Sequence, residues 1–213
     1  MTGCCPPNKY EAIFNPRFAH RAARRYERRG PARTERRILA FLEGQALPGM
    51  SVLEIGGGVG ELQIELLRRG ATRATNLELS GTYEAEAQRL LAEAGQQDRV
   101  RRHLVDIVEA PDQVEPADVV VLNRVVCCYE DYESLLRAAA RHCRRVLVFS
   151  HPPRNVLFRA AMTLLNLGMR LTGNGYRAYT HPPQRMLAAL QAEGLTPVYR
   201  DAGAAWCVQG LTR

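Results

Sequence analysis

Residues 54–60 read EIGGGVG, and this short stretch decides the fold of the 213-residue chain. It follows a β-branched run at 51–55 and precedes a helical pattern at 60–69. Glycine has no Cβ, so it lets the backbone turn sharply and lets a ligand approach closely. A glycine-rich turn between a strand and a helix is typical of nucleotide-binding α/β folds. The stretch therefore predicts such a fold, with a ligand site at the turn.

Strand-like and helical segments alternate after this turn. The run DVVVLN at 118–123 is nearly all apolar, as expected for a strand that is buried on both faces. Such alternation predicts a doubly wound, mostly parallel α/β sheet, and two strands near the C-terminus bring the expected number to seven. The other expected strands lie at 73–79, 100–105, 145–149, 195–200 and 204–211, and helices lie at 82–94 and 131–142.

Helical segments flank this core on both sides. Asn15-Pro16 is a helix-start signal, Gly30-Pro31 ends that helix, and a second helix is expected at about 32–45. After the fifth strand an apolar helix is expected at 153–171, followed by a turn at 173–175 and a helix at 183–193. We therefore predict a single structural domain. It consists of an N-terminal helical cap at 1–48 and a core at 49–213, with residues 151–180 as a helical lid.

Composition and charge exclude several classes of protein. No apolar run approaches the ~20 residues of a membrane span, and no secretory signal pattern is present. The six cysteines form no CxxC pair, so no metal site is predicted and a cytoplasmic protein with free thiols is expected. The net charge of +7 resides in residues 1–37, which hold ten basic and three acidic side chains. This arm is either a solvated helix face or a contact for nucleic acid or another anion.

Two carboxylates follow the next strands of the predicted sheet. Glu78 ends the second strand, where a carboxylate can accept hydrogen bonds from both hydroxyls of a ribose. Asp106 ends the third strand, within reach of an adenine amino group. A dinucleotide fingerprint would require its third glycine at position 61, which is Glu61. The spacing therefore indicates a nucleotide cofactor other than a dinucleotide.

The pattern acidic-x-G-x-G-x-G resembles the class I S-adenosylmethionine (SAM)-dependent methyltransferases over roughly residues 50–150. The resemblance implies that SAM is the cofactor and S-adenosylhomocysteine the product. In that family the glycine loop holds the methionine part, and the matching acids hold the ribose and the adenine. N-terminal helices cap the site, so Tyr26 and Arg25 are candidates for the SAM carboxylate. The implied cofactor-binding residues are Glu54, Gly56, Gly57, Gly58, Gly60, Glu78, Leu79, Asp106, Ile107, Asn123 and Tyr26.

Ligands of open α/β sheets lie beyond the carboxyl ends of the strands. This rule selects residues 123–129 after the fourth strand and Ser150-His151 after the fifth. Methyl transfer needs an aligned acceptor and, for some acceptors, a base, and a histidine titrates near neutral pH. His151 is the first candidate base and His181 the second, although each also stands as a helix-entry residue before Pro-Pro. Tyr129 and Asn123 are expected to orient the acceptor, or Tyr129 simply packs.

The expected reaction is methyl transfer to an O, N or S atom of a small, apolar or aromatic molecule. One alternative is an RNA-binding or RNA-modifying protein that uses the basic arm, although 123–126 read NRVV and lack the Asp/Asn-Pro-Pro-Tyr/Phe signature of amino-group methylation. Another is a thiol or metalloid methyltransferase that uses the pairs Cys4-Cys5 and Cys127-Cys128, which otherwise pack as buried thiols. A SAM-binding protein without catalysis is a further option.

The predicted helix at 153–171 carries an apolar stripe flanked by arginines. As a lid this helix would favour an apolar acceptor, and the flanking arginines leave contact with a membrane surface open. An apolar segment at this place is similar to the layout of the magnesium-protoporphyrin methyltransferases, in architecture only. The oligomeric state stays open. The stripe consists of Val156, Ala160, Leu164, Leu167 and Leu171, and the arginines are Arg154, Arg159 and Arg170.

Overall fold

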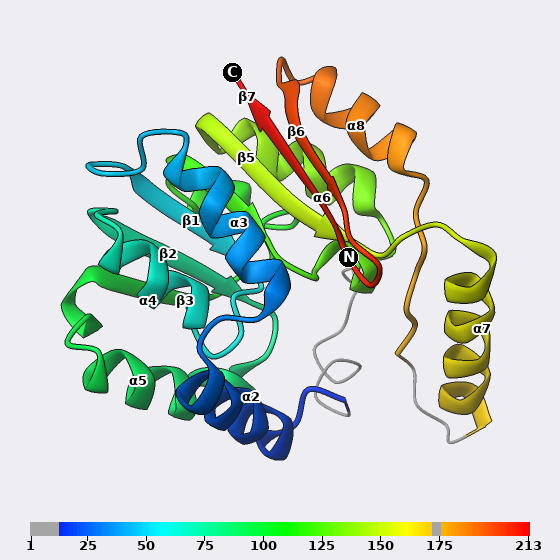
Figure 1. Cartoon of the computed structure of the whole chain (residues 1–213), viewed down its shortest axis with the longest axis horizontal. Helices are drawn as coiled ribbons and strands as arrows, with labels where there is room; N and C mark the ends of the chain where they lie inside the picture. The colour runs from blue at the N-terminus through cyan, green and yellow to red at the C-terminus, as the bar shows by residue number, and fades with distance from the viewer. Residues whose placement is uncertain (1–12, 172–175) are drawn as a thin grey trace.

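The computed structural model describes residues 13–171 and 176–213. Its centre is a seven-stranded sheet with the order β3-β2-β1-β4-β5-β7-β6 (Figure 1). The first five strands are parallel, whereas β7 is antiparallel to both β5 and β6. The strands are β1 (Ser51–Ile55), β2 (Arg73–Glu78), β3 (Val100–Leu104), β4 (Ala117–Leu122), β5 (Cys143–His151), β6 (Thr196–Ala202) and β7 (Cys207–Thr212). The predicted doubly wound, mostly parallel sheet is confirmed, with a mixed edge.

Helices cover both faces of the sheet. The seven α-helices in the described part of the chain are α2 (Pro16–Arg29), α3 (Arg33–Glu43), α4 (Glu61–Arg68), α5 (Glu84–Glu93), α6 (Tyr132–Arg141), α7 (Val156–Leu171) and α8 (Pro183–Gln191). Short 3₁₀ turns η1 (Gly81–Tyr83), η2 (Gln97–Arg99), η3 (Pro111–Gln113) and η4 (Val126–Cys128) lie between them. No helix among the described residues is long and apolar enough to cross a bilayer.

Alternate residues of the central strands build two separate cores. Val120 and Leu122 of β4 pack with α6 and α8, while Val119 and Val121 pack with α3 and α4 on the opposite face. All four side chains are fully buried. Because successive side chains of a strand point to opposite faces, a run of valines fits a strand that is covered on both sides. The interpretation of residues 118–123 as a doubly buried strand is confirmed.

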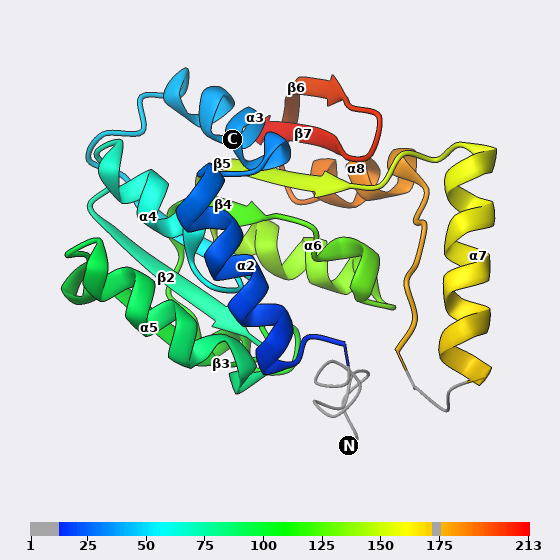
Figure 2. The ribbon, with the colours of Figure 1, turned by 60° about the horizontal axis from the view of Figure 1, so that its bottom comes forward.

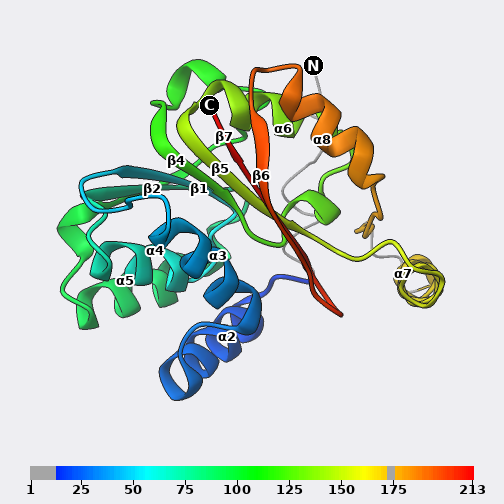
Figure 3. The same ribbon diagram turned by 45° about the horizontal axis from the view of Figure 1, so that its top comes forward.

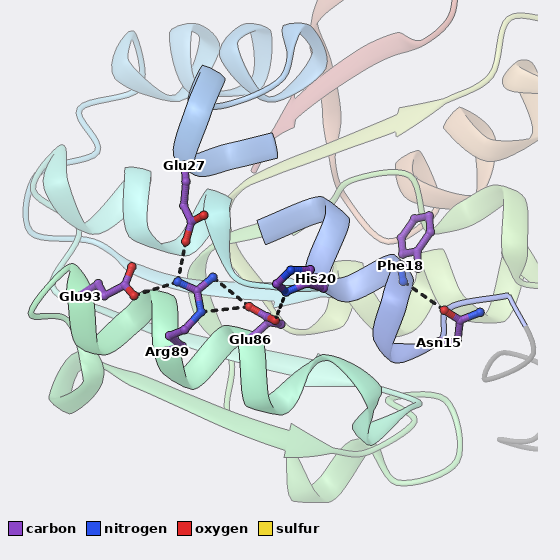
Figure 4. A network of polar contacts seen from close by, with 7 residues as sticks. All are labelled: Asn15, Phe18, His20, Glu27, Glu86, Arg89 and Glu93. Carbon is purple, nitrogen blue, oxygen red and sulfur yellow. Dashed lines mark hydrogen bonds and ion pairs between the residues drawn. The ribbon is translucent and has the colours of Figure 1, made fainter. Parts of the chain in front are cut away.

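The N-terminal helix α2 is capped and docked by polar contacts. The Asn15 side chain accepts a hydrogen bond from the backbone N–H of Phe18, as the sequence predicts for this helix start. Figure 4 shows Arg89 of α5 joined to Glu27 of α2 and to Glu86 and Glu93 of its own helix. On the inner side of α2, Ala19 and Ala23 are fully buried against the rest of the protein. These contacts fix α2 beside the carboxyl end of β2.

Helix α7 differs from the prediction. It begins at Val156 rather than at 153, because β5 continues to His151 and Asn155 caps the helix through a hydrogen bond from Phe158 N–H to its side chain. The motif His151-Pro152-Pro153 therefore does not open the helix. Figure 3 shows α7 end-on, standing apart from the sheet and from the other helices. The turn expected at 173–175 lies outside the described residues.

Candidate cofactor and acceptor site

The glycine-rich loop connects β1 to α4 through backbone angles that favour glycine. Gly56, Gly58 and Gly60 have φ values of 69°, 57° and 86°. The Gly56 N–H donates to the carbonyl of Leu77 at 2.7 Å, which ties the loop to the end of β2. Gly60 caps the N-terminus of α4 and faces Gln63 rather than the pocket described below. The loop therefore exposes its backbone at the carboxyl edge of the sheet.

Buried polar side chains support the loop from below. Gln63 donates to the Glu54 carboxylate at 2.8 Å, and the Gly57 N–H donates to the Asn76 side chain at 3.0 Å. A Cβ added at Gly57 would lie 2.4–2.6 Å from atoms of all three of these side chains. The Gly58 N–H donates to the carboxylate of Glu78. No local pattern in the sequence distinguishes Gln63 or Asn76, because their role depends on the packing of α4 against β2.

Arg102 of β3 also supports the loop, and no local sequence pattern identifies it. Its guanidinium donates to the Gly58 carbonyl at 2.8 Å and to Glu84, and it approaches the Gln63 side-chain oxygen at 3.4 Å. Only 6% of the side chain is exposed. One buried cation therefore holds the loop, α4 and α5 together. Only the pairing of β3 with β2 reveals this, because 44 positions separate Arg102 from Gly58.

A pocket opens at the carboxyl ends of the strands, and the loop forms one wall. Most of the predicted cofactor residues line it: Glu54, Gly56, Gly57, Gly58, Glu78, Leu79, Asp106, Ile107 and Asn123. Residues far away in the sequence complete the walls: Phe14, Phe18, Glu35, Glu61, Tyr83 and Arg124. The structure therefore gathers side chains of the N-terminal helices, the loop and the strand ends around one space.

One end of the pocket carries the carboxylate that follows β3. Asp106 accepts a hydrogen bond from the Tyr129 hydroxyl at 2.9 Å and another from the Val108 N–H at 2.9 Å. Ile107 is buried beside it and lines the pocket. Tyr129, predicted to orient an acceptor, lines the same pocket, and its hydroxyl contacts the residue predicted to bind adenine.

The opposite end holds a cluster of charged side chains, in which the two acids are more buried than the two arginines. Arg25 of α2 lies 3.4 Å from both Glu35 of α3 and Glu61 of α4. Arg124, which has a left-handed backbone with φ of 62°, lies 4.0 Å from Glu35 and stacks over Trp206 at 5.5 Å. Burial and the neighbouring Glu35 raise the pKa of Glu61 to about 7. Both acids and Arg124 line the pocket, so this end offers groups of both signs.

Tyr26 lies elsewhere than predicted. Its hydroxyl donates to Glu65 of α4 at 2.7 Å, and its ring is buried between α2 and α4 rather than in the pocket lining. Burial and this bond raise its pKa. Glu65 lies one turn after Glu61 on α4, so Tyr26 contacts α4 outside the pocket that Glu35 and Glu61 line. Its neighbour Arg25 reaches those two acids instead.

Each of the two candidate bases, His151 and His181, is hydrogen-bonded to a backbone carbonyl. His151 is 3% exposed, and its Nδ1 lies 2.9 Å from the Pro152 carbonyl, while Nε2 has no hydrogen-bond partner among the described residues. It is outside the pocket lining because β5 continues through it and pairs it with Cys207 of β7. His181 donates from Nε2 to the Tyr129 carbonyl at 3.0 Å and stacks on Tyr132. Burial lowers the pKa of both histidines. Their roles as bases stay predictions that this geometry does not favour.

Asn123 and the cysteine pair stand on the loop after β4. Asn123 lines the pocket, and its side-chain oxygen accepts from the Ser150 hydroxyl at 2.9 Å. The sulfur atoms of Cys127 and Cys128 are 3.6 Å apart, and Cys128 Sγ is 3.1 Å from the Tyr176 hydroxyl. Cys128 lines the pocket. Within residues 13–171 and 176–213, no group of three His, Cys, Asp or Glu side chains could hold a metal ion; Cys4 and Cys5 lie outside this part.

Three buried acids make the stability of the ligand-free protein depend on pH. Burial raises the pKa of Glu54 to about 8 and the pKa values of Glu61 and Glu78 to about 7. Because these folded-state values exceed the ordinary value of 4.5, the fold favours the protonated acids, and this stability is lost as the pH rises through 7–8. We expect the melting temperature to fall by several degrees, on the order of 5 °C, between pH 5 and pH 8.5.

Thermal unfolding followed by circular dichroism at a series of pH values measures this effect. The variant Glu54→Gln keeps a side-chain acceptor for Gln63 but cannot ionise, so its melting temperature should fall less over the same range. A fall of equal size in this variant and in the unmodified protein would show that Glu54 does not ionise in the way described.

Comparison with known proteins places this geometry in a family. The sequence pattern of a methyltransferase domain family matches residues 18–200. Magnesium protoporphyrin IX methyltransferase from Synechocystis PCC 6803, with bound S-adenosylhomocysteine, has 21% identity, covers 97% of each chain and gives a TM-score of 0.75. An O-methyltransferase family protein from Burkholderia thailandensis has 19% identity over 94% of this chain and 63% of that chain, with a TM-score of 0.70.

A third similar structure is an O-methyltransferase family 2 protein from Planctomyces limnophilus in complex with apigenin. It has 17% identity over 84% of this chain and 61% of that chain, with a TM-score of 0.62. No curated protein matches the sequence. At these identities the similarities to solved structures show a shared fold, whereas the family pattern spans most of the chain. The chain therefore belongs to the methyltransferase domain family and has the fold of the class I, SAM-dependent enzymes.

Proposed function

We propose that the chain transfers a methyl group from SAM to an O, N or S atom of a small, largely apolar or aromatic molecule. The observation that carries this proposal is the pocket itself. One of its walls is the glycine loop with the two carboxylates Glu78 and Asp106. Another is apolar and aromatic, with Phe14 and Phe18 beside Cys128. A cofactor and an acceptor of this character can therefore meet in one pocket.

The residues present fit the cofactor. The buried carboxylate of Glu78 at the end of β2 suits a ribose, and the apolar side chain of Ile107 suits an adenine ring. The backbone at Gly57 has no room for a Cβ, which suits a part of the ligand that lies close against it. In the proposal Glu78 accepts from the ribose hydroxyls and Asp106, oriented by Tyr129, accepts from the adenine amino group. The cluster of Glu35, Glu61, Arg25 and Arg124 offers charges of both signs to the amino-acid end. When bound, SAM supplies a methyl group on a positively charged sulfur.

The acceptor side is built from aromatic and sulfur groups. Phe14 contacts Tyr176 edge-on at 5.8 Å and Phe18 at 5.5 Å. Cys128, Leu79 and Met162 of α7 pack around Tyr176. Such walls favour an aromatic acceptor by excluding water and fixing a planar ring. In this proposal Asn123, fixed by Ser150, positions the acceptor, and the proton released from the attacking atom leaves to solvent through the pocket opening.

A methyl-transfer assay with an acceptor panel tests the proposal. Purified protein is incubated with SAM that carries a labelled methyl group and with phenols, catechols, aromatic carboxylic acids, aromatic amines and thiols. We expect labelled product with at least one aromatic acceptor, and loss of at least tenfold in the rate for Phe14→Ala, which removes an aromatic wall. Transfer only to RNA or protein, with none to any small molecule, would contradict the proposed acceptor class.

Arg102 provides a test of the loop as a cofactor support. Replacing Arg102 with alanine removes the bond to the Gly58 carbonyl and leaves Glu84 without its buried partner. Hydrogen bonds to charged groups contribute about 1.5–3 kcal/mol, so we expect binding of S-adenosylhomocysteine to weaken by roughly 10- to 100-fold. Titration calorimetry measures this change. Arg101→Ala is the matched control, because this exposed neighbour on the same strand should leave the affinity unchanged.

A further inference from the structure

Helix α7 presents an apolar face to solvent. Val156, Leu164, Leu167 and Leu171 have exposed fractions of 83%, 68%, 51% and 80%. Together with Ala160 they recur at the three- and four-residue spacing that places them on one side of the helix. The opposite side faces the body, where the side chain of Asn166 makes two hydrogen bonds to the backbone of Ala178. The stripe predicted to cover the acceptor therefore points away from the protein.

Arginines lie beside this apolar face, and acidic residues do not. Arg159 and Arg170 are exposed, and α7 contains no acidic residue. From the helical spacing, both lie about a quarter turn from the centre of the apolar stripe. A helix with an aliphatic face and arginines at its border is the arrangement that lies in the interface of a bilayer, with the apolar side among acyl chains and the guanidinium groups at the lipid headgroups.

Helix α2 carries a second basic surface. Arg17, Arg21, Arg24 and Arg28 are all exposed, and their spacing places them on one side of the helix, opposite the buried Ala19 and Ala23. None of the four has an acidic partner in the part of the chain that the structure describes, whereas Arg25, Arg68, Arg69 and Arg89 all have one. Four unpaired guanidinium groups in a row are complementary to a surface of negative charge.

Both helices border the pocket or the side chains packed beside it. Figures 1 and 2 show α2 and α7 on the side of the molecule toward which the parallel strands run, with α7 standing apart at the right. The first turn of α2 places Phe18, which is 44% exposed, in the pocket lining, and Met162 of α7 packs near Tyr176 at the other side. The two surfaces therefore lie on helices that are close to the proposed acceptor side of the pocket.

We propose that α7 and the arginine row of α2 dock the protein on an anionic lipid bilayer, with the apolar face of α7 among the acyl chains. An RNA would match the arginines but leaves the aliphatic face of α7 exposed, and that face carries no exposed aromatic ring for base stacking. A second copy of the chain would cover α7 but would bring two arginine rows of the same sign closer together. A bilayer with anionic headgroups satisfies both surfaces at once and goes beyond the proposed methyl transfer.

Vesicle flotation tests the proposal on the whole chain. The protein is mixed with vesicles of phosphatidylcholine alone or with phosphatidylglycerol added, and the floated fraction is measured at low and high salt. We expect flotation with the anionic vesicles, little with the neutral ones, and a decrease at high salt. Leu164→Asp with Leu167→Asp should weaken binding roughly 100-fold, because two leucines leave the acyl region. Arg21→Gln with Arg24→Gln should weaken it by about fivefold for each arginine.

Matched controls distinguish docking through these two surfaces from non-specific adsorption to vesicles. Val198→Asp changes an exposed apolar residue of β6, and Arg144→Glu changes an exposed cation at the amino end of β5; both should float like the unmodified protein. Absence of flotation with anionic vesicles would overturn the proposal. So would salt-sensitive RNA binding that depends on Arg21 and Arg24 with no vesicle binding. A concentration-dependent dimer that the double aspartate variant converts to monomers, again without flotation, would assign the face of α7 to a second copy instead.

Discussion

Replacing Gly57 with alanine is expected to reduce binding of S-adenosylhomocysteine by more than about 100-fold and to lower the melting temperature. The added Cβ would lie 2.4 Å from the Asn76 side-chain oxygen, 2.4 Å from Gln63 Nε2 and 2.6 Å from a Glu54 oxygen. Gln63 and Asn76 are fully buried and Glu54 is 2% exposed, so none can swing into solvent. The loop itself must therefore shift by a fraction of an ångström or more, and its backbone leaves the pocket wall.

Titration calorimetry and thermal unfolding measure the two effects separately. Gly168→Ala is the control, because a Cβ at that position on α7 would meet nothing within 4 Å. It should leave the affinity unchanged and should not lower the melting temperature, because alanine favours a helix more than glycine does. Unchanged affinity in Gly57→Ala, with the melting temperature lowered, would show that the loop supports the fold but does not form the cofactor wall.

Removing the carboxylate of Glu78 should have the second-largest effect. The variant Glu78→Ala is expected to weaken S-adenosylhomocysteine roughly 100-fold, since two hydrogen bonds from ribose hydroxyls and the partner of the Gly58 N–H are lost together. The substitution should weaken only the contacts with the ribose of the ligand. S-adenosylhomocysteine and adenosine should therefore both lose affinity in this variant, whereas adenine, which has no ribose, should keep whatever affinity it has.

The amide variant refines this prediction. Glu78→Gln keeps one oxygen that can accept from Gly58, so it should restore part of the affinity and most of the melting temperature. Glu115→Ala removes an exposed acid away from the pocket and serves as the control for a changed net charge. If Glu78→Ala bound S-adenosylhomocysteine as tightly as the unmodified protein, the ribose would lie elsewhere and the cofactor assignment of this pocket would be wrong.

The sequence predicted the parts of the molecule that depend on local pattern. The apolar runs placed the strands to within one or two residues, except that β7 begins three residues later than predicted. The glycine spacing placed the turn between β1 and α4. Because parallel strands end at one edge, Glu78 and Asp106 could be assigned to the same site from their positions alone. The pocket lining confirms that both lie there, while their individual roles toward the cofactor stay predictions.

What the sequence could not predict depends on contacts between distant elements. Glu35 and Glu61 belong to separate helices, and no local signal says that both would face Arg25. Arg102 sits on an edge strand of mixed composition, where an arginine is ordinarily solvated. Its burial follows from the close approach of α5 and the loop. Such residues are found only when the register of the sheet and the docking of the helices are known.

Two predictions differed from the structure for a physical reason. His151 was placed in the loop after the fifth strand, but pairing with β7 extends β5 two residues further, so that His151 ends the strand with its side chain buried. The stripe of α7 was expected to be covered because apolar helix faces are ordinarily core. The period of three and four residues identified the face correctly, but periodicity gives no information on which surface that face meets.

Isothermal titration of the purified protein with S-adenosylhomocysteine, with NAD as the control ligand, tests the central claim most directly. The geometry of the loop, Glu78 and Asp106 predicts micromolar binding of S-adenosylhomocysteine with one ligand per chain, and no heat with NAD. The Gly57→Ala variant in the same cell should give no measurable binding. Binding of NAD and not of S-adenosylhomocysteine, or equal binding by the variant, would contradict the assignment of this pocket to SAM.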